Sequence, residues 1–285
     1  MKDSILSKIG NTPIIEFIPN GKNRVFAKLE YFNPFGSIKD RAAYQIITDA
    51  IKNGAVHHKK EIVEATSGNM GIALSAISNI IGLSCTIIMP ENMSESRKRI
   101  IKAYGAKLIL TPQEKGIIGA IELAKSIAEE SDAFYVDQFN NPSSIIAHLE
   151  GTAPEIFNHM GQNCDIIILG VGSGGTISGI GQYFKTKSPN TQIIGVLPSI
   201  YPHKIQGIGA GFTPKILNKS VIDTIITVSD QEAFAGQNEL VRAHGIFAGI
   251  SSGAVFSAYK KLETNSNLLN KRILLIFPDS GERYI

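Results

Sequence analysis

Short apolar segments alternate with amphipathic helical segments along most of this chain, and that alternation limits the folds open to it. Two of the short segments, Cys85–Met89 and Asp165–Leu169, contain continuous apolar runs instead of alternating polar and apolar residues. Continuous runs are typical of parallel strands that helices cover on both faces. After Lys39, apolar residues recur at helical spacing until Gly54, which predicts a helix that ends there. We therefore expect an α/β fold with mostly parallel, twisted sheets and right-handed crossovers.

The strand–helix pattern also predicts how the chain is divided. Its 285 residues exceed the size of an average domain, and NNPSS, beginning at Asn140, interrupts the pattern before a new helix. We expect a smaller domain over residues 37–142 and a larger one formed by residues 1–36 and 143–285. Two such lobes would place the loops after their strands in a shared cleft, where these folds bind ligands. The predicted strands are Arg24–Leu29, Glu61–Glu64, Cys85–Met89, Lys107–Leu110, Ala133–Val136, Asp165–Leu169, Gln192–Leu197, Ile222–Val228 and Arg272–Phe277.

Composition excludes several classes of protein. Hydrophobic residues make up 43% of the chain and charged residues 19%, which provides for a large core and excludes general disorder. The net charge is +3 and the basic residues are scattered, so we expect no nucleic-acid partner. No charge occurs between Glu64 and Glu91, but glycine, serine and asparagine divide that stretch. We expect a turn, a buried helix and a buried strand there, and no membrane span.

The two cysteines, Cys85 and Cys164, lie far apart in apolar segments and neither has a CxxC partner. We expect buried, reduced thiols instead of a disulfide. The six histidines show no spacing typical of metal ligands, so we expect no metal. The N-terminal residues lack the apolar core of a secretory signal, which makes the cytoplasm the expected location.

Lys39 is the charged residue with the most unusual setting. It lies in NPFGSIKDRAA (Asn33–Ala43), just where a stretch rich in turn residues gives way to a helix. A lysine at such a bend is poorly placed for an ordinary solvated salt bridge, although Lys39, Asp40 and Arg41 could simply form a charged helix start. A free lysine has a pKa near ~10.4 and is a poor nucleophile at neutral pH, unless desolvation or attachment to a cofactor changes it.

The segment GVGSGGT (Gly170–Thr176) follows a predicted strand and precedes a predicted helix. Successive glycines allow backbone N–H groups to converge, and the helix N-terminus adds a partial positive charge. Together they favour a bound phosphate, by roughly 0.3 to 2 kcal/mol from the helix dipole alone. Ser173 and Thr176 can add hydroxyl donors. A glycine-rich turn with no ligand is the plainer alternative.

The same glycines also match the dinucleotide fingerprint G-x-G-x-x-G at Gly170, Gly172 and Gly175. That interpretation requires an acidic residue about 20 residues later, which would bind the ribose. No aspartate or glutamate occurs between Asp165 and Asp223. An NAD-dependent dehydrogenase is therefore disfavoured, and a smaller phosphate ligand is preferred.

Two further turns could complete a site around Lys39. TSGNMG (Thr66–Gly71) offers short polar side chains beside helix N–H groups and suits a carboxylate. GISSG (Gly249–Gly253) opens another predicted helix, where its serines could equally be ordinary N-caps. One amine and three such turns together suit an aldehyde cofactor that carries a phosphate, which is the chemistry of pyridoxal 5′-phosphate.

Eight blocks of sequence together resemble the cysteine synthase and cystathionine β-synthase family, in the β-family (fold type II) of pyridoxal-phosphate enzymes. They occur in the family's order over nearly the whole chain. The blocks are IGNTP (Ile9–Pro13), NPFGSIKDR (Asn33–Arg41), EATSGNMGIAL (Glu64–Leu74), QFNNP (Gln138–Pro142), GVGSGGTISG (Gly170–Gly179), PHKIQGIGAGF (Pro202–Phe212), GISSGA (Gly249–Ala254) and PDSGERY (Pro278–Tyr284). The resemblance implies two lobes like those of the tryptophan synthase β-subunit, with the active site in the cleft between them.

The resemblance also implies roles for individual residues. Lys39 matches the catalytic lysine that binds the cofactor and shuttles the substrate Cα proton. Asn69 matches the residue bound to the cofactor's 3′-oxygen, and Ser251 matches the serine that faces the pyridine nitrogen. A hydroxyl partner does not force that nitrogen to be protonated, so the ring is a weaker electron sink, which favours loss of a β-substituent over racemisation or transamination. The phosphate cup corresponds to Gly172, Ser173, Gly174, Gly175 and Thr176.

The substrate side of the site is implied in the same way. Thr66, Ser67 and Gln138 match positions that bind the α-carboxylate. Gly207 lies in the block that resembles the branch of the family using O-acetylserine. Met70 stands where the family usually has threonine, and the link from Leu197 to His203 is shorter than expected. Because methionine replaces threonine, the carboxylate loop is expected to lack one hydroxyl. The identity of the second substrate therefore stays open.

The implied reaction converts O-acetyl-L-serine and sulfide into L-cysteine and acetate through an aminoacrylate, in a homodimer; a thiol in place of sulfide would give the corresponding thioether. An O-acetylserine-dependent cystathionine β-synthase and a sulfide-releasing cysteine or lanthionine lyase are close alternatives on the same fold. A noncatalytic regulator is a more remote one, disfavoured because Lys39 and all three turns are present together.

Overall fold

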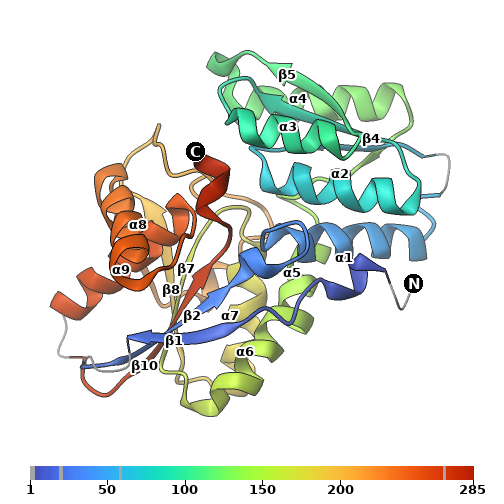
Figure 1. The fold of residues 1–285 in the computed structure, drawn as a ribbon. Helices are drawn as coiled ribbons and strands as arrows, with labels where there is room; N and C mark the ends of the chain where they lie inside the picture. The colour runs from blue at the N-terminus through green and yellow to red at the C-terminus, as the bar shows by residue number, and fades with distance from the viewer. Residues whose placement is uncertain (1–3, 19–21, 58–59, 266–267) are drawn as a thin grey trace.

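Two sheets organise the protein, and the smaller one is inserted into the chain of the larger (Figure 1). The fold is taken from a computed structural model, which describes residues 4–18, 22–57, 60–265 and 268–285. The larger sheet has the strand order β1-β2-β10-β7-β8-β9, and the smaller sheet the order β5-β4-β3-β6. The strands are β1 (Ile14–Ile18), β2 (Arg24–Leu29), β3 (Ile62–Ala65), β4 (Cys85–Pro90), β5 (Lys107–Thr111), β6 (Phe134–Tyr135), β7 (Ile166–Gly170), β8 (Gln192–Pro198), β9 (Thr224–Val228) and β10 (Arg272–Phe277).

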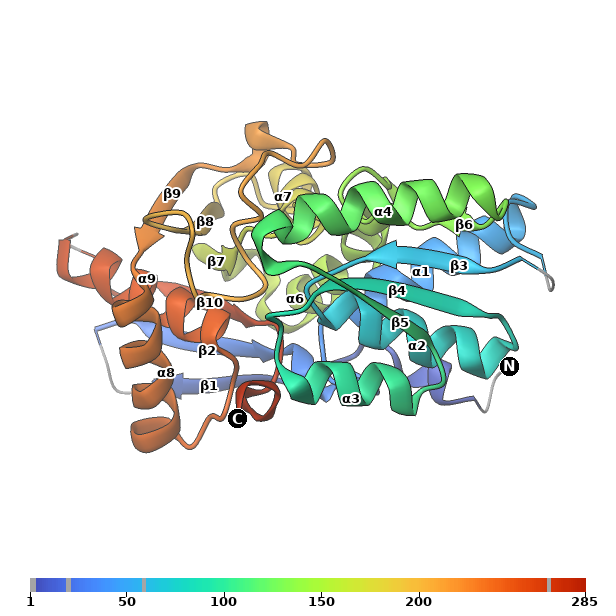
Figure 2. The ribbon, with the colours of Figure 1, turned by 90° about the horizontal axis from the view of Figure 1, so that it is seen from above.

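Helices cover both faces of both sheets. In the smaller sheet, α4 packs on one face, and α2 and α3 lie on the other, with α1 beyond α2. In the larger sheet, α8 and α9 cover one face, while α6 and α7 cover the opposite one. Figure 2 shows α4 and α3 on opposite sides of the smaller sheet. The helices are α1 (Lys39–Lys52), α2 (Asn69–Ile81), α3 (Glu95–Ala103), α4 (Gly116–Glu130), α5 (Ser143–Ala147), α6 (Ala153–Met160), α7 (Gly175–Lys187), α8 (Asp230–His244) and α9 (Ile250–Asn265).

The α/β prediction with mostly parallel sheets is confirmed. All nine predicted strands are present with small shifts at their ends, and every pairing except β1 with β2 is parallel. The continuous apolar runs of β4 and β7 are buried between helix layers, as their composition predicts. The helix after Lys39 also ends as expected, with Asn53 as its C-cap and Gly54 at φ +78°.

Two details differ from the prediction. β1 lies outside the predicted strands because it is an antiparallel edge strand, half-buried along its length, whose apolar run is interrupted by Glu16. Lys39 is the first residue of α1 instead of preceding the helix.

The uncharged stretch after Glu64 forms a loop, α2 and β4. Across the described residues, no helix combines the length and apolar character needed to cross a bilayer.

Cys85 and Cys164 are both buried free thiols, as predicted. Burial raises the pKa of each thiol to about 12. Neither cysteine is therefore suited to act as a nucleophile at neutral pH.

Candidate active site

Lys39 lies where the chain passes from the larger sheet into the smaller one. The N–H of Ile38 donates to the carbonyl oxygen of Pro278 at 2.9 Å, which ties this bend to the end of β10. Lys39 Nζ donates to Ser173 Oγ at 3.1 Å, across the space between the two sheets. Burial lowers the pKa of Lys39 to about 8, although the Glu64 carboxyl group acts in the opposite direction. Lys39 is thus a partly deprotonated amine near neutral pH.

The lowered pKa of Lys39 predicts a distinct labelling profile for the cofactor-free protein. Only the neutral amine reacts with acetic anhydride, so acetylation of Lys39 is expected to rise with pH and level off above about pH 8. A free lysine derivative added as an internal standard should continue to gain reactivity toward a pKa of about 10.4. Mass spectrometry of the digested protein and of the standard measures both profiles, and a Lys39 profile that follows the standard would refute this assignment.

The glycine loop between β7 and α7 forms a tight cup. Gly174, the N-cap of α7, has φ +91°, a conformation that favours glycine. A Cβ atom added to Gly172 would lie 2.3 Å from the carbonyl oxygen of Gly207. Only a glycine lets these two backbones approach so closely. The cup therefore joins a close backbone turn to a helix N-terminus, the arrangement that binds phosphate groups.

Gly172→Ala is expected to weaken pyridoxal-phosphate affinity by at least about 10-fold, because the added methyl group must displace backbone at Gly207. Titration of the cofactor-free protein, followed by absorbance, measures the affinity. Gly54→Ala is a suitable control, since its Cβ would meet open space at φ +78°. That control should cost about 1 kcal/mol of stability without changing cofactor affinity. Equal cofactor affinity for Gly172→Ala and the unaltered protein would contradict the cup.

The loop that follows β3, together with the first residues of α2, forms the segment Thr66–Met70 on the opposite side of the cavity. Thr66 Oγ1 accepts a hydrogen bond from the N–H of Gly68 at 3.0 Å, and Gly68 has φ +151°. A Cβ on Gly68 would collide with Arg97, which packs directly beneath the loop. Met70 is 1% exposed and packs into the core of the smaller sheet. The loop thus has polar side chains at Thr66 and Ser67 and an apolar wall at Met70.

Gln138 lies beside this loop and contacts a buried carboxyl group. Its Nε2 donates to Glu64 Oε1 at 2.9 Å and to the carbonyl oxygen of Ala65 at 3.0 Å. Glu64 is fully buried, and burial raises its pKa to about 8. Glu64 therefore holds a proton at neutral pH, and in that uncharged form it does not repel an anion bound near Gln138.

Asn69, the first residue of α2, is held by residues from the end of the chain. Its Nδ2 donates to Asp279 Oδ2 at 2.6 Å, and Arg283 donates to its Oδ1. Tyr284 also donates to Asp279 Oδ2, at 2.7 Å, and the Arg97 guanidinium lies 4.7 Å from the centre of the Tyr284 ring. Sequence reasoning missed this network: the block PDSGERY marks it, but nothing in the local sequence indicates which loop it contacts.

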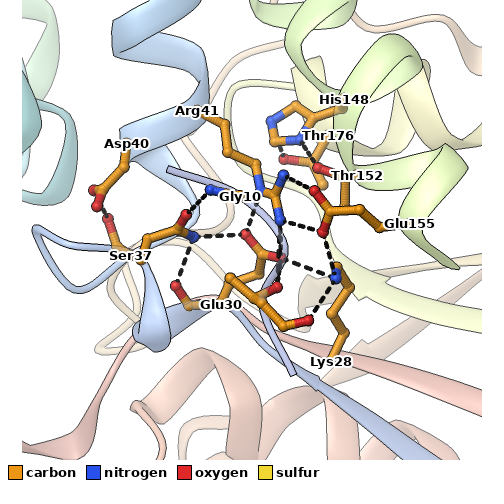
Figure 3. Close-up of polar contacts among 12 residues, drawn as sticks. Gly10, Lys28, Glu30, Ser37, Asp40, Arg41, His148, Thr152, Glu155 and Thr176 are labelled. Carbon is orange, nitrogen blue, oxygen red and sulfur yellow. Dashed lines mark hydrogen bonds and ion pairs between the residues drawn. The ribbon is translucent and has the colours of Figure 1, made fainter. Parts of the chain in front are cut away.

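A second network missed by sequence reasoning lies beneath the start of α1 (Figure 3). Arg41 donates to both carboxylate oxygens of Glu30 and of Glu155, over distances of 2.6 to 2.9 Å. Lys28 donates to Glu155 at 2.8 Å and lies 3.8 Å from Glu30. Two cations and two anions thus neutralise one another in the interior. Arg41 belongs to this network, so the charged run at the helix start is not a solvated surface.

These elements meet at one cavity of about 330 Å³. Ser251, the second residue of α9 and 2% exposed, lines the same space. Gly175 is the only predicted site residue that does not line it; a Cβ there would collide with Ser144, so Gly175 packs α7 against α5. The predicted site residues that line the cavity are Lys39, Thr66, Ser67, Asn69, Met70, Gln138, Gly172, Ser173, Gly174, Thr176, Gly207 and Ser251. Among the described residues, no group of histidine, cysteine and carboxylate side chains could hold a metal ion.

The cavity satisfies the requirements of pyridoxal phosphate. It combines a lysine of lowered pKa, a glycine cup at a helix N-terminus, and polar groups at Asn69 and Ser251 between them. A sequence profile of the family described as pyridoxal-phosphate dependent enzyme matches residues 5–279. The chain therefore belongs to the pyridoxal-phosphate-dependent enzyme family.

Individual relatives narrow this class. The chain is 44% identical over 293 residues to cysteine synthase B of Campylobacter jejuni, covering 99% of this chain and 97% of the relative. It is 40% identical to cysteine synthase A of Escherichia coli K12, with 97% and 92% covered. A solved structure, the O-acetylserine dependent cystathionine β-synthase of Helicobacter pylori, superposes with a TM-score of 0.95 at 35% identity, covering 100% of this chain and 97% of that one. Within the family, the chain is thus similar to the cysteine synthases and shares the fold of this β-synthase.

Proposed function

We propose that this protein converts O-acetyl-L-serine and sulfide into L-cysteine and acetate. The observation that supports this most is the convergence of Lys39 and the three predicted loops on one cavity, in a chain similar to cysteine synthases. In the reaction, the bond from Cβ to the acetoxy oxygen breaks and acetate leaves with the electron pair. A bond from sulfur to Cβ then forms, and the proton taken from Cα is returned.

The cavity residues divide into those that would hold the cofactor and those that would hold the substrate. Pyridoxal phosphate, when bound, supplies an aldehyde carbon for amines and an electron-withdrawing ring. Lys39 would bind the aldehyde end, and Asn69 and Ser251 the ring. The N–H groups and hydroxyls of Gly172, Ser173, Gly174, Gly175 and Thr176 would bind the phosphate.

Lys39 would also move the substrate proton. With a pKa of about 8, its amine can take a proton from Cα and return it near neutral pH. Thr66 and Ser67 would bind the α-carboxylate through hydroxyl and N–H donors, and Gln138 would join them by turning one amide hydrogen away from Glu64 or from the carbonyl oxygen of Ala65. Met70 would add an apolar wall that excludes water from the reacting carbon.

One experiment tests the reaction and separates it from its close alternatives. The holoenzyme is given O-acetyl-L-serine with equal concentrations of sulfide, homocysteine and cysteine, and the products are identified by mass spectrometry. Cysteine is expected as the main product. A preference for cystathionine would replace the proposal by the activity named in the Helicobacter pylori structure, and lanthionine with released sulfide would indicate the lyase.

We also propose the organisation in which this reaction takes place: two domains, with residues 37–142 forming the smaller one, in a cytoplasmic homodimer. The separate sheets support the division, and the two buried free thiols agree with a reducing compartment. Family resemblance supports the dimer. Hydrogen exchange should show different protection in the two domains, cell fractionation should recover the protein with cytosolic markers, and sedimentation should give twice the monomer mass.

A further inference from the structure

His148 contacts the candidate phosphate cup at Thr176 and has no part in the function proposed above. It begins the π-helical turn His148–Thr152 between α5 and α6 and is 1% exposed. Its Nδ1 lies 2.9 Å from Thr152 Oγ1, and its Nε2 lies 3.1 Å from Thr176 Oγ1 (Figure 3). A Cβ on Gly179 would lie 2.8 Å from His148 Cβ, so that glycine lets α7 pack closely against the turn that carries His148.

The surroundings of His148 keep its ring neutral. Burial lowers its pKa to about 3, and the positive charges of Arg41 and Lys39 act in the same direction, while Glu30 opposes them. A neutral imidazole carries one N–H, so one ring nitrogen donates a hydrogen bond and the other accepts one. The choice of nitrogen decides what the Thr176 hydroxyl can offer to a ligand.

Two arrangements of hydrogen atoms fit the distances. In the first, Nδ1–H donates to Thr152 and the Thr176 hydroxyl donates to Nε2. The Thr152 hydroxyl hydrogen is then buried without an acceptor, because His148 is its only hydrogen-bond partner among the described residues. In the second, the Thr152 hydroxyl donates to Nδ1, and Nε2–H donates to Thr176 Oγ1. Only the second arrangement uses the Thr152 hydrogen and leaves that of Thr176 free.

We propose that His148 is a positioning residue that donates Nε2–H to Thr176 Oγ1 and thereby presents the Thr176 hydroxyl hydrogen to the cofactor's phosphate. Thr176 lines the cavity, whereas His148 does not, so His148 acts through the threonine. This role rests on the phosphate cup of the proposed function. It gives the cup a neutral donor oriented by a buried ring, in addition to the backbone N–H groups.

The test compares two amides of different reach at position 148, each titrated with pyridoxal phosphate and with pyridoxal, which lacks the phosphate. In His148→Gln the side-chain amide nitrogen can replace Nε2, whereas in His148→Asn it reaches only the position of Nδ1. His148→Asn is expected to weaken pyridoxal-phosphate affinity about 10- to 100-fold and pyridoxal affinity less than about 3-fold. His148→Gln should stay within about 3-fold for both ligands. Thr176→Val should lose as much pyridoxal-phosphate affinity as His148→Asn. The double variant should lose little more affinity than either single variant.

Each other outcome overturns the role of His148. Equal losses of affinity for pyridoxal phosphate and pyridoxal would show that the histidine only supports the fold. An unchanged pyridoxal-phosphate affinity in His148→Asn would show that His148 does not act on the phosphate. Affinity losses of His148→Asn and Thr176→Val that add fully in the double variant would show that the two residues are not coupled. If the unaltered protein does not prefer pyridoxal phosphate to pyridoxal, the cup itself is wrong and His148 loses its role with it. Should the variants fail to fold, ¹H–¹⁵N NMR of the histidine-labelled holoenzyme still decides: Nε2–H supports the proposal, and Nδ1–H or a doubly protonated ring refutes it.

Discussion

Replacing Lys39 with alanine is expected to reduce turnover of O-acetyl-L-serine about 10³-fold or more, because the variant loses the amine that binds the aldehyde and moves the Cα proton. The protein should still bind the cofactor through the glycine cup, although borohydride should no longer attach it covalently. Steady-state rates and intact mass after borohydride treatment measure the two effects.

Lys52→Ala is the matched control for this prediction. Lys52 ends the same helix α1 that Lys39 begins, and its side chain is exposed. Its removal should leave both the rate and the borohydride adduct unchanged. Turnover close to normal in Lys39→Ala would refute the role assigned to Lys39, while a colourless holoprotein before any substitution would refute the cofactor assignment.

The largest expected effect on stability comes from Arg41→Met. The guanidinium binds Glu30 and Glu155, and its own side chain is 4% exposed. Its loss leaves two carboxylates to share Lys28, so the variant should lose about 3 to 5 kcal/mol of the free energy of unfolding. Urea unfolding near pH 7, with fluorescence and circular dichroism recorded together, measures the loss.

Arg24→Ala provides the control. Arg24 also donates two hydrogen bonds to a carboxylate, that of Glu16, at 2.7 and 2.6 Å, but its side chain is exposed. That exposed pair should contribute far less to the free energy of unfolding than the buried network does, because water screens it. If Arg41→Met and Arg24→Ala lower the free energy of unfolding equally, burial does not explain the contribution of the Arg41 network.

The dependence on pH follows from Glu30. Arg41 is the largest of the contacts that outweigh burial and lower the pKa of Glu30 to about 2. Because the folded-state pKa is depressed below the ordinary value of 4.5, this stabilisation is complete above that pH and disappears as the pH falls toward 2. The deficit of Arg41→Met should therefore shrink as the pH is lowered through this range.

Sequence reasoning predicted the elements and the cavity-lining loops well because both depend on local patterns. Parallel strands such as β4 and β7 are buried on both faces, so their continuous apolar runs are recognisable without a structure. The positive φ of Gly174 is a conformation that favours glycine, so the residue type itself indicates the turn. The loops then converge because the carboxyl ends of parallel strands lie on one edge of each sheet.

The networks behind those loops could not be predicted, because each joins side chains from distant parts of the chain. Arg41 looks like the start of a charged helix until Glu155 is placed beside it. Asn69 gives no sign that Asp279 holds it. Met70 could be identified as a departure from the family pattern, but only packing shows that it belongs to the core of the smaller sheet. Local sequence thus predicts what lines the cavity better than what supports it.

The insertion of the smaller sheet into the chain of the larger one restricts how the cavity can open. The two chain segments that connect the sheets lead into α1 and α5, and these two helices pack side by side. A body attached at two neighbouring points turns most easily about the line that joins them. This connection favours opening by a swing of one sheet relative to the other about α1 and α5, over a separation of the two sheets as free bodies.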